Sequence, residues 1–293
     1  MRVTDSIREQ SVRKAQQRAA EQVMERTETA VSGFRVRKPK DDPSSFASIS
    51  VKEASLTRLA DRKRSLVART DDLSLAEGAL AQAGGIMQRA RDLAVQMADG
   101  SMGSSERALA AKEVAQLRQA LVGLANARGT SGYLFAGSNV ETAPFDAAGV
   151  FGGNDASVAV EVADGLFVRG NASGAMAFTA AGGRDVFAEL QAFETALTAN
   201  DSAGIQAGIN AMTESHAQVV RARSEAGLTM DRFRMSVEVT ENAAVALSRV
   251  KASESEADLA TAYSELTSAS SAYERVLEIT RRTLGSVDLS KFP

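Results

Sequence analysis

The fold class is decided by residues 59–94, which read LADRKRSLVARTDDLSLAEGALAQAGGIMQRARDLA. An apolar residue recurs in it at every seventh position: Leu59, Leu66, Leu73, Leu80, Met87 and Ala94. A seven-residue repeat keeps one narrow apolar stripe on the same face of a helix over many turns. The stretch therefore predicts a long helix with a coiled-coil seam, in which Gly84 and Gly85 either permit close approach of another helix or form a soft point.

The chain before this stretch contains a first helix and then a break. Ser6 followed by Glu9 suggests a capping box, and no Gly or Pro follows until Gly33, which is placed to end the helix. The break extends to Pro43, a residue suited to the first position of a new helix, with Asp42 as the N-cap. A second helix is therefore expected to begin near Pro43.

Beyond the seam the helical pattern stops twice. Gly100 and Gly103 interrupt it, and a third helix is expected from residues 104–105 to about Arg128. Between residues 129 and 183 glycine is dense, aromatic residues cluster and the helical period disappears. This region interrupts the helical part of the chain.

The middle of that region carries the signals of a β-hairpin. Val158, Val160 and Val162 alternate with smaller or polar residues, Asp164-Gly165 is a two-residue turn signal, and residues 166–168 supply a return strand. We interpret the region as a small β-rich domain inserted between helices.

The helical pattern resumes near Asp185, is broken around residues 200–208 and continues from about Ala211. Its last part is the most regular, with stripe residues alternately four and three positions apart. The stripe consists of Leu259, Tyr263, Leu266, Ser270, Tyr273, Leu277, Thr280, Leu284 and Val287. Terminal helices with such stripes cannot bury them alone, so they are expected to pair with each other, with neighbouring copies, or with both.

These elements predict an α+β fold that is mainly α. We expect an elongated helical coiled-coil rod, built from the N- and C-terminal helices, with a small inserted β-rich domain. The expected segments are 1–42 (N-terminal helix and break, inner coiled-coil layer), 43–130 (helical rod), 131–184 (β-rich insertion), 185–250 (helical return) and 251–293 (C-terminal coiled-coil helix).

Composition excludes several classes of protein. The 293 residues include no Cys and a single His, so disulfides, thiolate catalysis and Cys-ligated metals are excluded. A formal net charge of −3 gives no global attraction to nucleic acid or to an anionic membrane. No signal peptide and no membrane-spanning apolar run is expected, which fits a cytoplasmic protein or one exported without a cleaved signal.

No motif indicates an enzyme, a cofactor or a metal. Phosphate-loop, dinucleotide-binding, nucleophile-elbow and zinc-protease patterns are absent from the sequence. The acidic pairs Asp41-Asp42 and Asp71-Asp72 do not face each other on a helix, and His216 lies in a polar helical stretch that suits a solvated side chain. The basic cluster at residues 35–40 is better explained by ion pairs, within its loop or between subunits, than by nucleic acid.

Four segments in order carry a family resemblance. They are SGFRVRKPKDDP at 32–43, GYLFAGSN at 132–139 with Pro144-Phe145 following, RARSEAG at 221–227, and ESEADLA at 254–260. They resemble segments of the flagellin superfamily, and the second and third are similar to the hook-filament junction branch known as hook-associated protein 3. The resemblance assigns motif positions Gly33, Pro39, Asp41, Asp42, Pro43, Tyr133, Leu134, Phe135, Ala136, Gly137, Arg221 and Gly227.

The resemblance implies a structural subunit of the bacterial flagellum, exported by the flagellar type III apparatus and assembled outside the cell. It implies partners in copies of the chain itself, a neighbouring hook-associated protein, flagellin and an export chaperone. Assembly is expected to use Ile7, Val23, Leu259, Tyr263, Leu266, Tyr273, Leu277 and Leu284. The last residues, 288–293, are less apolar than the family pattern suggests.

Two alternatives remain open at this point. The chain could be flagellin itself, which shares the terminal helices and the Asp-Asp-Pro break, although residues 133–137 favour the junction branch. From another class, it could be a helical export chaperone or adaptor that binds a partner helix in a groove.

Overall fold

The seven-residue repeat forms a single long helix in the structure, a computed structural model that describes the backbone of residues 2–289 and the side chains of residues 7–282. This helix, α2 (Pro43–Met97), begins at the predicted proline. Leu66, Leu80 and Met87 of the repeat are at most 1 % exposed, so the seam is confirmed. A Cβ on Gly84 or Gly85 would meet nothing within 4 Å, so neither glycine is needed for another described segment of the chain to approach α2 closely.

The chain is mainly helical and divides into two units, residues 1–57 with 244–293 and residues 58–243. We call these the terminal unit and the central unit. The five segments expected from the sequence divide the chain more finely, and their boundaries remain predictions. The helices α2 and α6 (Ser202–Ser255) contribute residues to both units.

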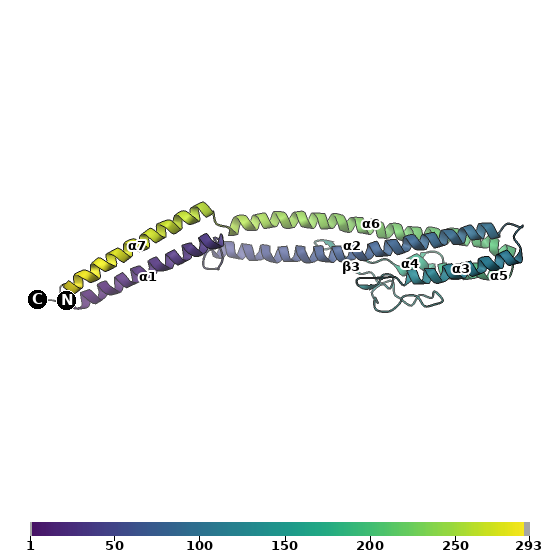
Figure 1. Cartoon of the computed structure of the whole chain (residues 1–293), viewed down its shortest axis with the longest axis horizontal. Helices are drawn as coiled ribbons and strands as arrows, with labels where there is room; N and C mark the ends of the chain where they lie inside the picture. The colour runs from purple at the N-terminus through teal and green to yellow at the C-terminus, as the bar shows by residue number, and fades with distance from the viewer. Residues whose placement is uncertain (1, 290–293) are drawn as a thin grey trace. The chain divides into compact units, whose positions relative to one another are not determined.

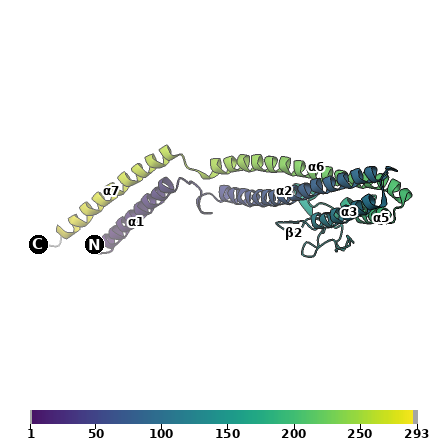
Figure 2. The ribbon, with the colours of Figure 1, turned by 45° about the vertical axis from the view of Figure 1, so that its right-hand side comes forward.

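In the terminal unit, α1 (Arg2–Ser32) and α7 (Leu259–Leu289) lie side by side and run in opposite directions, as Figures 1 and 2 both show. The helix α1 ends before Gly33, whose φ of 73° suits glycine, as predicted. It begins at Arg2, so Ser6 lies inside the helix and the predicted capping box is wrong. No Gly or Pro in residues 2–5 prevents the helix from starting earlier.

The central unit combines the remaining helices with short strands. Its further elements are α3 (Ser104–Ala125), β1 (Arg128–Gly129), β2 (Gly132–Tyr133), β3 (Ala159–Ala163), β4 (Leu166–Arg169), α4 (Gly174–Phe178), the 3-10 helix η1 (Ala180–Gly182) and α5 (Val186–Thr198). The strands form two antiparallel pairs, β1 with β2 and β3 with β4. The predicted hairpin is confirmed, with Val160 opposite Val168.

The insertion shares its core with the helices of the central unit. Phe178 of α4 packs edge-on against Phe135 and Phe145, with ring centroids 5.4 and 5.6 Å apart. These rings belong to the same buried cluster as Leu80 and Met87 of α2. The hairpin valines pack on a second cluster that includes Leu66, Leu73, Ala226, Met230 and Phe233.

The predicted break around residues 200–208 is present but shorter: α5 ends at Thr198, Asn200 has a φ of 53°, and α6 already begins at Ser202, so its extension to Gly208 is wrong. Asp201 caps the helix by accepting a hydrogen bond from the Ala203 N–H at 3.0 Å. Gly204 and Gly208 lie inside α6 and allow close helix packing, so they do not break the helix. A Cβ at Gly204 would lie 2.8 Å from the Ala196 methyl group, and one at Gly208 would lie 2.8 Å from Phe193, so both let α5 approach α6 closely.

Candidate functional site

A narrow seam of mostly small side chains joins the two terminal helices. Ala19 and Ala30 of α1 and Ala262 of α7 are buried, and an ion pair of 2.7 Å links Arg26 to Glu265 across the helices. Small seam residues leave larger apolar side chains on the outer faces. Those that are more than half exposed are Ile7, Met24, Val31, Leu259, Tyr263 and Ile279.

The residues expected to carry assembly fall into three groups. Val23, Leu266, Tyr273 and Leu277 are half-buried. Ile7, Leu259 and Tyr263 are exposed, at 59 %, 53 % and 58 %. The side chain of Leu284 lies outside the described residues. The described residues of this set therefore divide into half-buried and exposed positions, and their role in assembly remains a prediction.

The break after α1 is hydrogen-bonded to the break before α7, and we call this junction the elbow. The Arg35 N–H donates to the Ser255 carbonyl at 2.8 Å, and the Ala257 N–H donates to the Gly33 carbonyl at 2.8 Å. Phe34 and Glu256 form an isolated antiparallel bridge. Two of the four family-like segments thus meet in space, because the backbone groups left unpaired at each helix end satisfy one another.

Charged side chains extend the elbow to the start of α2 and the end of α6. Lys52 donates to both Glu254 carboxylate oxygens at 2.9 Å, and this contact lowers the pKa of Glu254. Lys251 pairs with Glu53 at 2.8 Å. These pairs were not predicted from the sequence, since nothing in the local pattern of these residues distinguishes them from solvated charges.

The two motif acids after α1 accept hydrogen bonds from backbone N–H groups, and Asp42 thereby caps α2. Asp42 accepts from the Ser44 and Ser45 N–H groups at 3.1 and 3.0 Å, and the Ser45 contacts hold its pKa well below the usual range. Asp41 accepts from the Arg37 and Lys38 N–H groups, of which the first lowers its pKa most. The N-cap prediction for Asp42 is confirmed.

The rest of the loop is tied back to α1. The Asp41 N–H donates to the Lys38 carbonyl at 3.0 Å, which closes a turn with Pro39 at its second position. Arg35 pairs with Asp42 at 3.3 Å, which confirms the ion pair predicted within the loop, and Arg37 pairs with Glu28 of α1 at 2.6 Å. Between this loop and α1 lies an open groove of about 670 Å³, with Met24 and Val31 along it.

The Tyr133–Gly137 motif builds the core of the insertion. Phe135 and Ala136 are fully buried, and Tyr133 stacks under the Arg128 guanidinium at 4.2 Å. Gly137 has a φ of 73°, and a Cβ there would collide with the Asn154 carbonyl at 2.0 Å. The motif is therefore structural, as expected for a core cluster.

The third motif lies on α6. Arg221 reaches the Gly182 carbonyl at 3.5 Å, a long contact for a hydrogen bond. Gly227 has open space around the position of a Cβ. Among the described residues, neither position has a contact that demands its residue type.

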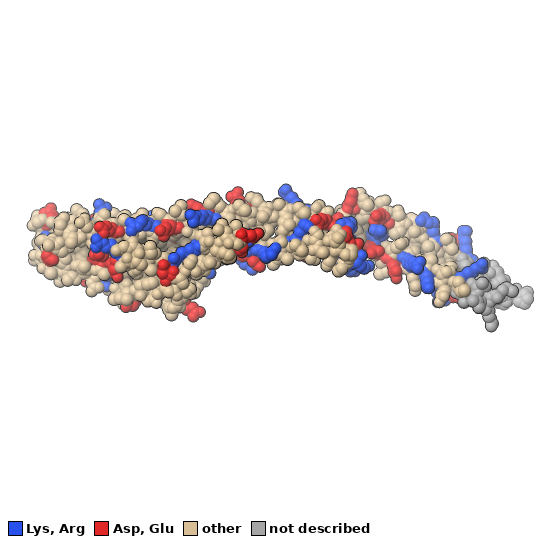
Figure 3. Space-filling view, turned by 180° about the vertical axis from the view of Figure 1, so that it is seen from behind, with Lys and Arg blue, Asp and Glu red and all other residues tan. Residues whose placement is uncertain are grey.

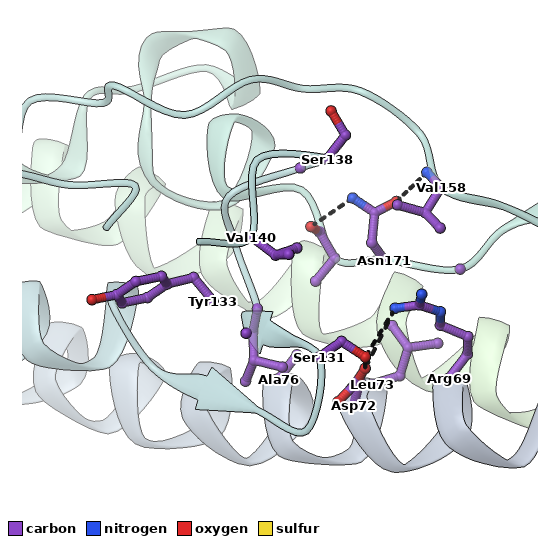
Figure 4. A pocket seen from close by; sticks show the side chains of 15 residues that line it. Arg69, Asp72, Leu73, Ala76, Ser131, Tyr133, Ser138, Val140, Val158 and Asn171 are labelled. Carbon is purple, nitrogen blue, oxygen red and sulfur yellow. Dashed lines mark hydrogen bonds and ion pairs between the residues drawn. The ribbon is translucent and has the colours of Figure 1, made fainter. Parts of the chain in front are cut away.

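A small pocket of about 240 Å³ lies between α2, β2 and the Asn171 loop, with Arg69, Asp72 and Tyr133 around it (Figure 4). Asp72 is buried and accepts from the Thr130 N–H at 3.0 Å and the Ser131 hydroxyl at 2.8 Å. It anchors the β1–β2 turn on α2. The Asp72 carboxylate in this pocket therefore already has hydrogen-bond donors from the protein itself.

Metal binding and membrane insertion find no support in the described part of the chain. No group of three or more His, Asp or Glu residues there could hold a metal ion. His216 is half-buried on α6, less solvated than expected. Among the described residues, no helix is both long enough and apolar enough to cross a bilayer.

The amino-acid sequence is similar to sequences of known flagellar proteins. Residues 3–140 match the bacterial flagellin N-terminal helical region. Flagellar hook-associated protein 3 of Salmonella typhimurium is 32 % identical over 133 residues, which is 45 % of this chain and 42 % of the relative. The chain resembles flagellar hook-associated protein 3. The Escherichia coli hook-associated protein 3 is also 32 % identical, over 39 % of this chain and 36 % of its own length.

These matches span less than half the length of either hook-associated protein 3. Solved structures extend the likeness in fold. A putative flagellar hook-associated protein from Vibrio parahaemolyticus has a TM-score of 0.67 at 21 % identity, over 74 % of this chain and 100 % of that one. The Xanthomonas campestris FlgL has a TM-score of 0.60 at 21 % identity, over 68 % and 98 %. The resemblance and the mainly α fold class inferred from the sequence are confirmed.

Proposed function

We propose that this chain is a structural subunit of the bacterial flagellum at the junction between hook and filament. It acts by self-assembly and by adapting a bending hook to a stiff filament, and it catalyses no reaction. The observation that carries the proposal is the 32 % identity to hook-associated protein 3 over 133 residues, supported by the match of residues 3–140 to the flagellin N-terminal helical region. The location outside the cell follows from this role.

The geometry of the terminal unit supports an assembling role. The seam between α1 and α7 is built largely from small residues, while larger apolar side chains such as Met24 and Leu259 face outward. A helix pair with this distribution buries its outer residues only when another molecule covers them. Copies of the chain, a neighbouring hook-associated protein and flagellin are the partners we propose, with an export chaperone before assembly.

Surface charge favours protein partners over nucleic acid. On the face drawn in Figure 3, Lys and Arg are interspersed with Asp and Glu, and no broad area carries one sign. A nucleic-acid site needs a basic stripe or patch. We further propose export through the flagellar type III apparatus without a cleaved signal peptide.

Deletion of the gene tests the proposal. Electron microscopy of the cell surface is expected to show hooks without filaments, and the culture medium is expected to contain secreted flagellin. A plasmid copy of the intact gene is the control and restores filaments.

Two other outcomes would contradict the proposal. Hooks without filaments and without flagellin in the medium would identify the chain as the filament subunit. Normal filaments would exclude both flagellar roles and favour a helical chaperone or adaptor.

A further inference from the structure

The central unit carries apolar side chains on the outermost faces of its two long helices. On α6, Leu228, Met235 and Val239 are 61 %, 59 % and 68 % exposed. On α2, Val67 and Leu75 are 41 % and 51 % exposed. None of these residues belongs to the terminal helices to which the sequence assigned assembly.

Each set forms a stripe with a charged residue inside it. The α2 stripe is Val67, Asp71 and Leu75, and the α6 stripe is Leu228, Arg232, Met235 and Val239. Neighbouring members of each stripe lie three or four residues apart, which places them on one helix face. The faces point away from the buried seam residues, such as Leu73 and Phe233.

The charged members are exposed and opposite in sign. In the part of the chain with described side chains, neither Asp71 nor Arg232 has an ion pair. Their neighbours are already paired, Asp72 with Arg69 and Asp231 with Arg234. Asp71 and Arg232 are therefore each available to a partner.

Two ion pairs fix how α2 and α6 are aligned. Glu77 pairs with Arg223 at 2.5 Å, and Lys63 pairs with Glu241 at 2.7 Å. Interpolation between these contacts along the two helices places Leu75, Asp71 and Val67 within about two residues of the levels of Leu228, Arg232 and Met235. The order of apolar, charged and apolar groups therefore matches at equal heights.

We propose that the α2 stripe of one copy docks on the α6 stripe of a second copy in the same orientation. Leu75 then meets Leu228, Asp71 meets Arg232, and Val67 meets Met235. This contact joins two different surfaces, so it can repeat from copy to copy around a ring or a tube. A symmetric contact between two α6 stripes would instead bring Arg232 against Arg232, which like-charge repulsion disfavours.

Charge reversal in cells tests the contact, which rests on the proposed function. In the deletion strain, Asp71→Arg or Arg232→Asp is expected to lower the number of filaments per cell by about tenfold, equivalent to about 1.4 kcal/mol. The double variant is expected to recover filaments because it restores opposite charges. Lys112→Asp, an exposed charge on α3, is the matched control and is expected to keep them.

The outcomes separate the inference from the proposed function. If deletion removes filaments but both single variants restore them fully, the docking contact is wrong and the junction role stands. If deletion leaves filaments intact, the junction role itself fails. Equal thermal unfolding midpoints of the purified variants show that the exposed substitutions leave the fold intact.

Cross-linking locates the contact directly, since the chain has no cysteine of its own. Cells that produce Leu75→Cys and Leu228→Cys chains together are expected to yield a disulfide-linked dimer of the two after mild oxidation. Val95→Cys, another exposed α2 position, is the control partner for Leu228→Cys and is expected to yield none. Dimers from Leu228→Cys alone would show a symmetric contact and overturn the proposal.

Discussion

The central and terminal units differ in what fills their cores. The central unit encloses large side chains, with Phe135, Phe178, Phe187, Phe193 and Phe233 all at most 2 % exposed. The buried hydrophobic residues described in the terminal unit are smaller: Ala19, Ala30, Val36, Ile49 and Ala262. Stabilisation by burial grows with apolar area, so the central unit is stabilised more by its own core, and under the proposed function the terminal unit gains most from a partner.

Removal of an aromatic ring from the core of the central unit is the test of this comparison with the largest expected effect. Phe178→Ala is expected to lower the free energy of unfolding by about 3–5 kcal/mol, because it removes a ring that contacts Phe135, Phe145 and Phe187 and leaves a cavity. Denaturant unfolding of the purified chain measures the change.

An exposed phenylalanine provides the control. Phe167, on the outer side of the hairpin, is 59 % exposed, and Phe167→Ala is expected to change stability by at most about 0.5 kcal/mol. Equal losses for Phe167 and Phe178 would contradict the assignment of stability to the aromatic cluster.

Loss of the elbow cap tests the terminal unit with a smaller effect. Asp42→Ala removes the acceptor for the Ser44 and Ser45 N–H groups and is expected to cost about 1 kcal/mol. Hydrogen exchange at the Arg35 and Ala257 amides, which bond across the elbow, reports the loss locally. Asp42→Asn keeps a capping oxygen and is expected to retain protection, so equal losses in both variants would exclude the capping role.

Acid sensitivity of the elbow is the smallest expected effect. Lys52 lowers the pKa of Glu254 below its usual 4.5, so the folded state favours the ionised carboxylate. This stabilisation is complete well above pH 4.5 and is lost as the pH falls through the lowered value. Protection factors at Arg35 and Ala257 are expected to decline on acidification, and Glu254→Gln is expected to reduce the dependence. An unchanged pH profile in that variant would assign the effect to other acids, such as Asp41.

The local sequence pattern predicted those helix ends and turns that depend only on residues nearby in the chain. Gly33 ends α1 because it adopts a positive φ, Pro43 begins α2, and the Asp164-Gly165 turn closes the β3–β4 hairpin. The same reasoning failed at Gly204 and Gly208, since a glycine that breaks a helix and one that admits a neighbouring helix have the same sequence signal. It failed at Ser6 because nothing earlier in the chain stops the helix.

The sequence by itself determined the long α2 seam, the end of α1 at Gly33 and the start of α2 at Pro43, the hairpin and the flagellin-like segments, because each depends on residues a few positions apart. Only the tertiary structure decided that residues 33–36 bond to residues 255–257, that Lys52 pairs with Glu254, and that the stripes containing Asp71 and Arg232 lie at matching heights. These contacts join positions far apart in the chain. Periodicity shows which face of a helix is apolar, but not which other segment covers it or leaves it exposed.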